Sequence, residues 1–448
     1  MRGLFVAATK QHIGKTSVSM ALLQALHRIY GKGRVGYMKP VGHRWVRADD
    51  GSKVDKDALV AKEYFGISSH IGDMSPVVMT SGYTRRFLDG VISPVEQWSN
   101  ISEAYERLKS EHDFVVVEGT GHTGKNGPLH SSHHNSLLGC SVGSIVGVSN
   151  ATVAAGLNIP AVMVANGGVG STFDELALNR TELLSENVEV KGVIVNKVRE
   201  EKVEMVKHYL GLALARWKCP LVGCVPYGEG FDTPSLADLE LLYDTKMLSG
   251  EDSRLHRIGN YELVTTSLGR FMSKLNWKRV SGSGFHNLIK ETCVITHWSR
   301  VDIILGLLSH CYDGGKPTKK ERWRGALLLT GREPELPEYV ESYIRASNLP
   351  SLKTGRSTAE TLSALEGFTA KMHRGDRSRT RSVIELYEPK LVSPFPLIRQ
   401  AVTAAQLGTS LPPSGAPHTP SSLSLLPLRI SACCSSNEGQ RETSTTCT

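Results

Sequence analysis

The segment ATKQHIGKTS, residues 8–17, contains the residue types that bind nucleotide phosphates. It follows an apolar run and opens a helical pattern, so backbone N–H groups and the helix N-terminus would converge on phosphate oxygens. Lys15 would neutralise charge on the β- and γ-phosphates, and the Thr16 hydroxyl would ligate Mg²⁺. Thr9 stands where the usual phosphate loop has its first glycine. The segment predicts a P-loop that binds ATP with Mg²⁺; the alternative is a chance Gly-Lys-Thr at a helix start.

A carboxylate follows a second buried run. Phe114–Val117 is entirely apolar, and Glu118 comes directly after it, before a glycine. Ligands of doubly wound sheets bind at the carboxyl ends of the strands, where such a carboxylate holds Mg²⁺ directly or through water. Glu118 and the loop at Lys15 therefore predict one nucleotide and magnesium site at one edge of a sheet.

From residue 1 to about 245, short apolar runs alternate with longer amphipathic stretches. This alternation predicts an α/β fold, a doubly wound parallel sheet with helices on both faces. The predicted strands are Leu4–Ala8, Val35–Met38, Phe114–Val117, Ala161–Ala165, Val193–Val195 and Leu221–Val225, and the predicted helices include Ser17–Tyr30, Phe173–Leu184 and Glu200–Trp217.

The remainder of the chain divides into three parts. Residues 246–290 have no regular period and are predicted to be a connecting segment. Residues 291–388 again alternate strand and helix patterns, as a smaller α/β domain would. Residues 389–448 are rich in Ser, Pro and Thr with almost no aromatic residue, a composition typical of disorder.

One polar stretch, residues 125–141, interrupts the first domain. Its His130, His133 and His134 are metal-binding residue types, but no carboxylate or cysteine stands beside them at ligand spacing. A solvated polar insertion is the favoured interpretation, with a metal site as the alternative.

Composition restricts the class of protein. Lys and Arg number 52 against 44 Asp and Glu, an excess too small and too scattered for nucleic-acid binding. No stretch has the length and apolarity of a membrane span, and the N-terminus lacks a secretory pattern. The eight cysteines form no C-x-x-C pair, so a reducing, cytoplasmic location is expected.

Several motifs together resemble one known family. ATKQHIGKTS, YMKPVG (37–42), VDKDAL (54–59), VVVEGTG (115–121) and VIVNKV (193–198) look like the dethiobiotin synthetase superfamily of P-loop ATPases. MSPVVMTSGYTRRFLDG (74–90) and ANGGVGSTFDELALN (165–179) are more similar to the ATPase-like N-terminal region of long phosphotransacetylases. VITHWSRVDIILGLL (294–308), GALLLTG (325–331) and TAKMHRGD (369–376) resemble the DRTGG regulatory domain of those proteins.

The resemblance implies roles for individual residues. Lys15 and Lys39 would be catalytic, Lys39 by contacting a carboxylated substrate. The nucleotide would be held by Thr9, Gly14, Lys15, Thr16, Ser17 and Asn196, with Asn196 at the adenine edge, and Mg²⁺ by Thr16, Asp57 and Glu118. For Asp57 a first-turn helix charge is the alternative.

Where an acetyltransferase domain would begin, the chain has its Ser/Pro/Thr-rich segment, so phosphate acetyltransferase activity is not expected. The sequence predicts a Mg·ATP-binding protein with slow hydrolysis that senses a metabolite or partner. The alternatives are an ATP-dependent ligase that activates a carboxylate or carbamate, and an adaptor whose nucleotide site has decayed.

The expected partners are a nucleotide, a small-metabolite effector or substrate, and a second copy of the chain. The loop Gly167–Thr172 follows a predicted strand and opens the predicted helix at Phe173. By resemblance to dethiobiotin synthetases, this loop would lie near a homodimer interface. The alternative is that its glycines only permit a tight turn.

Overall fold

The computed structural model describes most of the 448-residue chain. The described residues are 2–121, 144–228, 230–231, 233–273, 292–313, 316–317, 325–332, 337–368 and 370–392. The predicted polar insertion at 125–141, with its histidines, lies outside this part of the chain. So do residues 393–448 of the predicted disordered segment 389–448.

The first sheet is parallel throughout, with strand order β10-β9-β8-β1-β7-β2. It confirms the predicted α/β class and all six predicted strands. The strands are β1 Gly3–Ala8, β2 Val35–Met38, β7 Phe114–Glu118, β8 Ala161–Asn166, β9 Val190–Val198 and β10 Leu221–Pro226.

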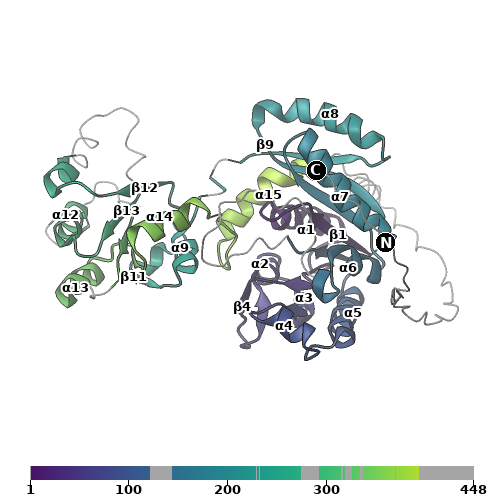
Figure 1. Ribbon diagram of the computed structural model, residues 1–448, viewed down its shortest axis with the longest axis horizontal. Helices are drawn as coiled ribbons and strands as arrows, with labels where there is room; N and C mark the ends of the chain where they lie inside the picture. The colour runs from purple at the N-terminus through teal and green to yellow at the C-terminus, as the bar shows by residue number, and fades with distance from the viewer. Residues whose placement is uncertain are drawn as a thin grey trace, which may run out of the picture. The chain divides into compact units, whose positions relative to one another are not determined.

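Helices cover both faces of this sheet (Figure 1). The chain steps from β1 to β2 in one direction and from β2 through β7, β8 and β9 to β10 in the other. Because such crossovers are right-handed, the first helix lies on one face and the later ones on the other. The first is α1 Lys15–Tyr30, and the later ones are α5 Pro94–Glu111, α6 Asn150–Gly156, α7 Gly170–Ser185 and α8 Val203–Ala215.

The connection from β2 to β7 is long and carries part of the site. It contains the strand pairs β3 Val41–Gly42 with β6 Val77–Val78 and β4 Trp45–Arg47 with β5 Lys53–Asp55, and the helices α2 Lys56–Phe65, α3 Ile71–Met74 and α4 Tyr83–Leu88. The hairpin of β4 and β5 leads directly into α2, so the residues at this junction are placed at the sheet edge by local structure.

A second sheet follows β10, with strand order β11-β17-β16-β13-β12. Its strands are β11 Met247–Ser249, β12 Asn260–Leu263, β13 Thr292–His297, β16 Ala326–Thr330 and β17 Ser351–Lys353; β11 is antiparallel to β17 and the other pairings are parallel. Helices α9 Leu236–Tyr243, α12 Val301–Cys311, α13 Glu338–Ser347 and α14 Thr358–Glu366 accompany it, with the small pair β14 Tyr312–Asp313 and β15 Lys316–Pro317. We call residues 236–366 the second-sheet region.

Two predicted boundaries differ from the structure. The predicted connecting segment 246–290 supplies β11 and β12 to the second sheet, strands too short to give a recognisable period. The end of the predicted second domain forms α15 Arg377–Val392, which packs on α1 and β10. Its residues Val383, Ile384, Tyr387 and Leu391 belong to the core of the first sheet.

The return of α15 has a physical cause. Among the crossover helices, α1 alone lies on its face of the first sheet, so β10 would otherwise expose apolar surface there. Leu391 lies over Gly223 of β10, where a Cβ atom would collide with its Cδ2 atom. The predicted tail therefore begins later than Pro389, because Leu391 is 1% exposed.

No helix in the described parts of the chain combines the length and apolarity needed to cross a membrane.

Leu391→Ala tests this packing. We expect the free energy of unfolding to fall by about 2 to 5 kcal/mol, because a buried leucine is truncated and leaves a cavity. Urea unfolding of the full chain followed by circular dichroism measures it. Glu385→Ala, on the exposed side of the same helix, is the control and should change stability little. Equal effects of the two substitutions would contradict the packing of α15 on the first sheet.

Candidate functional site

The loop between β1 and α1 has the geometry of a phosphate loop. Gly14 caps α1 with φ 87°, a left-handed conformation that favours glycine. A Cβ atom at Gly14 would also collide with the Asn196 side chain. The loop therefore needs glycine at this position for two independent reasons, and Lys15 and Thr16 follow in the first turn of α1.

Asn196 holds this loop in place. Its side-chain amide donates to the Ile13 carbonyl at 2.7 Å, and its oxygen accepts from the Lys197 N–H at 2.8 Å. The side chain is fully buried and does not line the pocket. The structure thus differs from the predicted adenine contact: both polar groups of Asn196 are used on backbone.

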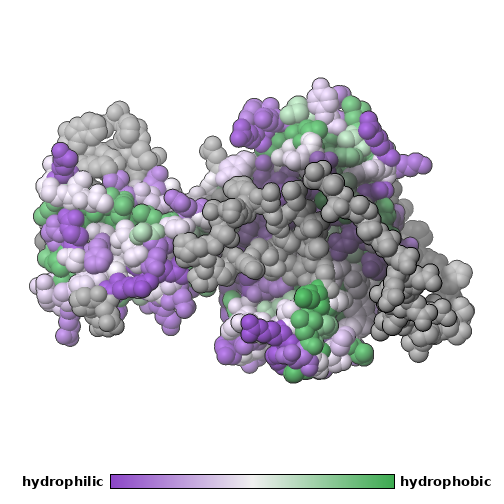
Figure 2. All heavy atoms as spheres, in the orientation of Figure 1, coloured by the Kyte–Doolittle hydropathy of each residue, from purple (hydrophilic) through white to green (hydrophobic). Residues whose placement is uncertain are grey.

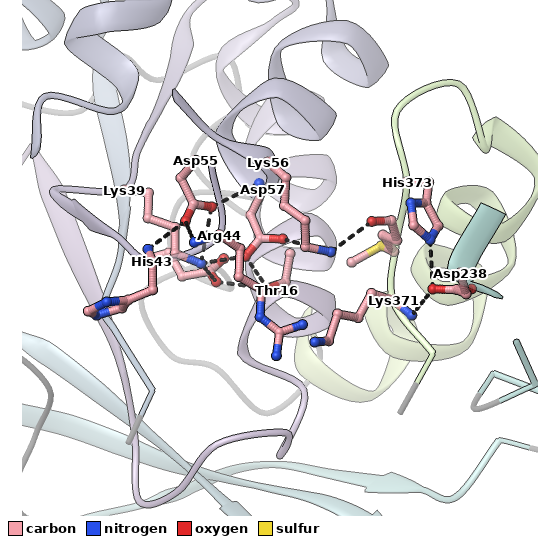
Figure 3. A network of polar contacts seen from close by, with 12 residues as sticks. Thr16, Lys39, His43, Arg44, Asp55, Lys56, Asp57, Asp238, Lys371 and His373 are labelled. Carbon is pink, nitrogen blue, oxygen red and sulfur yellow. Dashed lines mark hydrogen bonds and ion pairs between the residues drawn. The ribbon is translucent and has the colours of Figure 1, made fainter. Parts of the chain in front are cut away.

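Acidic side chains gather around the Lys39 ammonium at the carboxyl edge of the first sheet (Figure 3). Lys39 Nζ lies 3.1 Å from Glu118 Oε1 and 3.6 Å from Asp55 Oδ1, and it also pairs with Asp57. The Thr16 hydroxyl donates to Glu118 Oε1 at 2.8 Å and lies 3.3 Å from Asp57 Oδ2. The sequence predicted four of these five residues, and the structure brings them together.

Asp55 is the member of this cluster that sequence analysis missed. It caps α2 by accepting from the Asp57 N–H at 2.9 Å, and it accepts from the His43 N–H at 3.1 Å. An acid two residues before another, at a helix start, is the signal that indicates such a cap. Asp55 thereby fixes Asp57 and the turn after Lys39 in one geometry.

Glu118 is positioned by the strands. It ends β7, directly beside Val6 of β1, and is fully buried. The Tyr37 hydroxyl of β2 donates to its second oxygen at 2.9 Å. Three adjacent strands therefore fix the carboxylate next to Thr16.

Burial and charge shift the ionisation of the cluster. Burial alone would lower the pKa of Lys39, but Asp55, Asp57 and Glu118 raise it well above its ordinary value. Burial would raise the pKa of Asp57, but Lys39 and Lys56 lower it. The Asp55 pKa is raised by burial against the opposing charge of Lys39. Lys39 and Asp57 are therefore stabilised in their charged forms, whereas burial disfavours the charge on Asp55.

Burial lowers the pKa values of two other basic groups of the site, Lys15 and His43. Burial lowers the pKa of Lys15 to about 8, although Glu118 opposes the shift. Burial and the charge of Lys39 lower the pKa of His43 to about 4, so this imidazole is neutral at pH 7. Lys15 is thus a poorly neutralised cation that an incoming anion would stabilise.

The donor set fits a magnesium ion bound together with phosphate. In the described residues, no three His, Cys, Asp or Glu side chains form a metal site by themselves. Mg²⁺, however, takes one or two carboxylates plus water and phosphate oxygens. The Thr16 hydroxyl and the carboxylates of Asp57 and Glu118 would supply hard oxygen ligands of that kind.

The pocket around this cluster is strongly cationic. Seven Lys and Arg side chains line it against three carboxylates; the cations are Lys15, Lys39, Arg44, Lys56, Lys197, Lys371 and Arg379, and the acids are Asp55, Asp57 and Glu118. Gly14 and Ser17 also line it. Arg44, Lys56 and Lys371 were not predicted, because scattered lysines and arginines have no distinctive pattern.

Two predicted positions lie apart from the pocket lining. Thr9 is buried, and its hydroxyl donates to Glu175 Oε2 of α7 at 3.2 Å. Gly167 meets the backbone of Val198, where a Cβ atom would approach to 2.7 Å. These contacts give both residues a packing role: Thr9 joins the phosphate loop to α7, and Gly167 allows the close turn into α7.

Known proteins resemble this chain along most of its length. A phosphate acetyltransferase of Nitratidesulfovibrio vulgaris is 22% identical over 86% of this chain and 50% of its own length. An ATP-dependent dethiobiotin synthetase of Nitrosospira multiformis is 26% identical over 53% of this chain and 94% of its own length. The chain spans about half the length of the phosphate acetyltransferases that it matches.

Among solved structures, the MinD cell division protein of Aquifex aeolicus is 15% identical, with a TM-score of 0.29, over 51% of this chain and 84% of its own. The AAA domain family AAA_26 matches residues 2–138 and 135–235, just over half of the chain and the whole of the first sheet. The resemblance to dethiobiotin synthetases and phosphotransacetylases is thereby confirmed. The chain belongs to the AAA_26 family, and its first sheet forms a P-loop ATPase-like domain.

Proposed function

We propose that this protein binds Mg·ATP in the pocket at Lys15, hydrolyses it slowly, and acts as a nucleotide-dependent regulator. The observation that carries the proposal is the convergence of Lys15, Thr16 and Glu118 in one pocket with an excess of cations. Such an excess suits a polyphosphate rather than a neutral ligand. Calorimetric titration with ATP, with and without Mg²⁺, tests the proposal, and a chain that binds no nucleotide would refute it.

In this proposal, different residues bind the phosphates and the metal ion. Lys15 would neutralise the β- and γ-phosphates, and Thr16, Asp57 and Glu118 would hold Mg²⁺, which would stabilise charge that develops on the transferred phosphoryl group. The three carboxylates that line the pocket all contact Lys39. None of the three is free to deprotonate an attacking water, which supports slow hydrolysis.

A second candidate is an ATP-dependent ligase of the dethiobiotin synthetase type. Its support is the relative of that name, matched over 94% of its length, and the placement of Lys39 beside the phosphate loop. A screen of metabolites for faster phosphate release separates the two. A sharp stimulus by one carboxylic acid or amine favours the ligase, whereas binding with little turnover favours the regulator.

Lys15→Met should abolish ATP binding and yet stabilise the free protein. The Lys15 pKa is about 8 in the fold and 10.5 ordinarily, so between these pH values the unfolded chain binds more protons. Stability therefore rises with pH across that window, and at pH 7 the charged lysine costs up to about 3 kcal/mol.

Urea unfolding at pH 7 and calorimetry measure both effects. Lys32→Met, at an exposed lysine, is the control and should change neither quantity. Wild-type ATP affinity in Lys15→Met would remove the phosphate-loop assignment.

Glu118→Gln should reduce the Mg²⁺ dependence of ATP binding, because the amide keeps the hydrogen-bond acceptor but loses the charge that attracts the ion. We expect the ratio of the ATP dissociation constants without and with Mg²⁺ to fall toward one. Glu103→Gln, at an exposed position of α5, should leave this ratio unchanged. A wild-type ratio in Glu118→Gln would show that the carboxylate does not serve the ion.

We also propose a homodimer through α7 and α8. Apolar side chains are exposed along these helices, among them Leu178, Tyr209 and Leu212, which are 55%, 55% and 59% exposed. Figure 2 shows apolar residues at the surface over α8. Exposed apolar surface of this kind is typical of interfaces.

Leu212→Glu should therefore convert a dimer into a monomer in sedimentation velocity, whereas Leu241→Glu on α9 should not. If the dimer binds Mg·ATP better than the monomer, nucleotide will tighten it. A wild-type chain that sediments as a monomer at micromolar concentration, with and without Mg·ATP, would contradict the dimer.

A further inference from the structure

Residues 370–372, which precede α15, line the nucleotide pocket, although they lie more than 300 residues after the phosphate loop. Ala370, Lys371 and Met372 line the pocket together with Lys15 and Thr16. Lys56 of α2 donates to the Met372 carbonyl at 3.1 Å. The segment is thus attached to the P-loop domain at the pocket itself. We call residues 370–376 the returning segment.

A second attachment holds the same segment from outside the pocket. The Arg374 guanidinium forms a bidentate ion pair with the two carboxylate oxygens of Asp49, at 2.8 and 3.0 Å, and also pairs with Glu63. Both acids belong to the connection between β2 and β7. Exposed ion pairs contribute little energy, but together with the Lys56 contact they fix the register of the returning segment.

The other side of the returning segment is held by one buried carboxylate, Asp238 (Figure 3). Asp238 Oδ1 accepts from the Lys371 N–H at 3.2 Å and contacts His373 Nε2 at 2.6 Å. Its other oxygen accepts from Arg379 at 3.2 Å and from the Ser235 N–H at 2.9 Å. Asp238 is 1% exposed, so losing these partners would leave a buried charge unpaired.

Asp238 belongs to α9, and α9 belongs to the second-sheet region. Leu236, Leu239 and Tyr243 of this helix pack in one core with Ile295 and Leu328 of the second sheet. The carboxylate that positions the returning segment therefore moves with the second-sheet region rather than with the phosphate loop.

The Lys371 side chain points away from Asp238, in the direction opposite to that of its own backbone N–H. Figure 3 shows it reaching from the returning segment toward Arg44 and Thr16, while its backbone N–H meets Asp238. In the described part of the chain, no carboxylate is paired with the Lys371 ammonium. A cation aimed into a pocket that already has more cations than acids is stabilised only when an anion enters.

We propose that Lys371 is a further phosphate-binding cation of the nucleotide pocket, and that Asp238 is a positioning residue that couples it to the second-sheet region. This inference rests on the proposed ATP binding. By linkage, a ligand or partner that shifts α9 changes the affinity for nucleotide, and nucleotide changes the affinity for that ligand by the same factor.

Lys371→Met should weaken Mg·ATP binding about tenfold in calorimetry, the size expected for one hydrogen bond to a charged phosphate. Lys371→Arg should restore most of the affinity, because it keeps the charge. Lys202→Met, at an exposed lysine of the P-loop domain, is the control. The effect should shrink for ADP or AMP if Lys371 contacts the γ-phosphate.

Asp238→Asn should weaken Mg·ATP binding to a similar extent, and should add nothing in the Lys371→Met background, because both act through one cation. Hydrogen exchange of residues 370–376 should slow when Mg·ATP binds the wild type and not when it binds Asp238→Asn. His373→Gln perturbs the same contact more mildly and replaces Asp238→Asn if that variant does not fold.

The outcomes separate this inference from the function on which it rests. If Lys15→Met abolishes binding while Lys371→Met and Asp238→Asn bind as the wild type does, ATP binding stands and the inference is overturned. Additive effects of Lys371→Met and Asp238→Asn would overturn the positioning role alone. A wild-type chain that binds no ATP would refute both.

Discussion

The buried ion cluster at Lys39 is the constraint on which the rest of the site depends. Asp55, Asp57 and Glu118 all lie within 4 Å of one ammonium group at the edge of the first sheet. Removing water from such charges is unfavourable, and their mutual attraction offsets this penalty only when every partner lies within ion-pairing distance. The ends of β2 and β7 and the start of α2 must therefore keep one arrangement, and Thr16 is held in it by Glu118.

Charge also explains what the pocket admits. Lys39 neutralises part of the acidic cluster, while Lys15, Arg44, Lys56 and Lys371 add cations around it. A free divalent cation would enter against this excess, whereas a polyphosphate would relieve it. Magnesium and nucleotide are therefore expected to bind together. The phosphates would supply the negative charge that the carboxylates of the pocket do not provide. Burial lowers the pKa of Lys15 to about 8, so an incoming phosphate would stabilise the charged form of this lysine.

The sequence was sufficient for the strands of the first sheet and for the position of the loop between β1 and α1. Strands such as Phe114–Val117 are continuous apolar runs because parallel strands are buried on both faces, and such runs are easily recognised. The second-sheet strands β11 and β12, of three and four residues, are too short to show a period. Asn196 shows the limit of motif reasoning: its position at a strand end was predicted, but its contact with Ile13 depends on three-dimensional packing.

The sequence could not predict that Asp238, Lys371 and α15 lie near the first sheet, and the reason is the order of the elements along the chain. The second-sheet region lies in the chain between β10 and α15, both of which belong to the first sheet's core. A domain that is inserted within another has two chain connections to it, whereas a domain that is joined to the end of another has only one. The two connections here meet at Asp238, which joins the start of α9 to the returning segment. Lys371 of the returning segment, whose backbone Asp238 holds, also lines the nucleotide pocket, so the second-sheet region and the pocket share one segment of the chain.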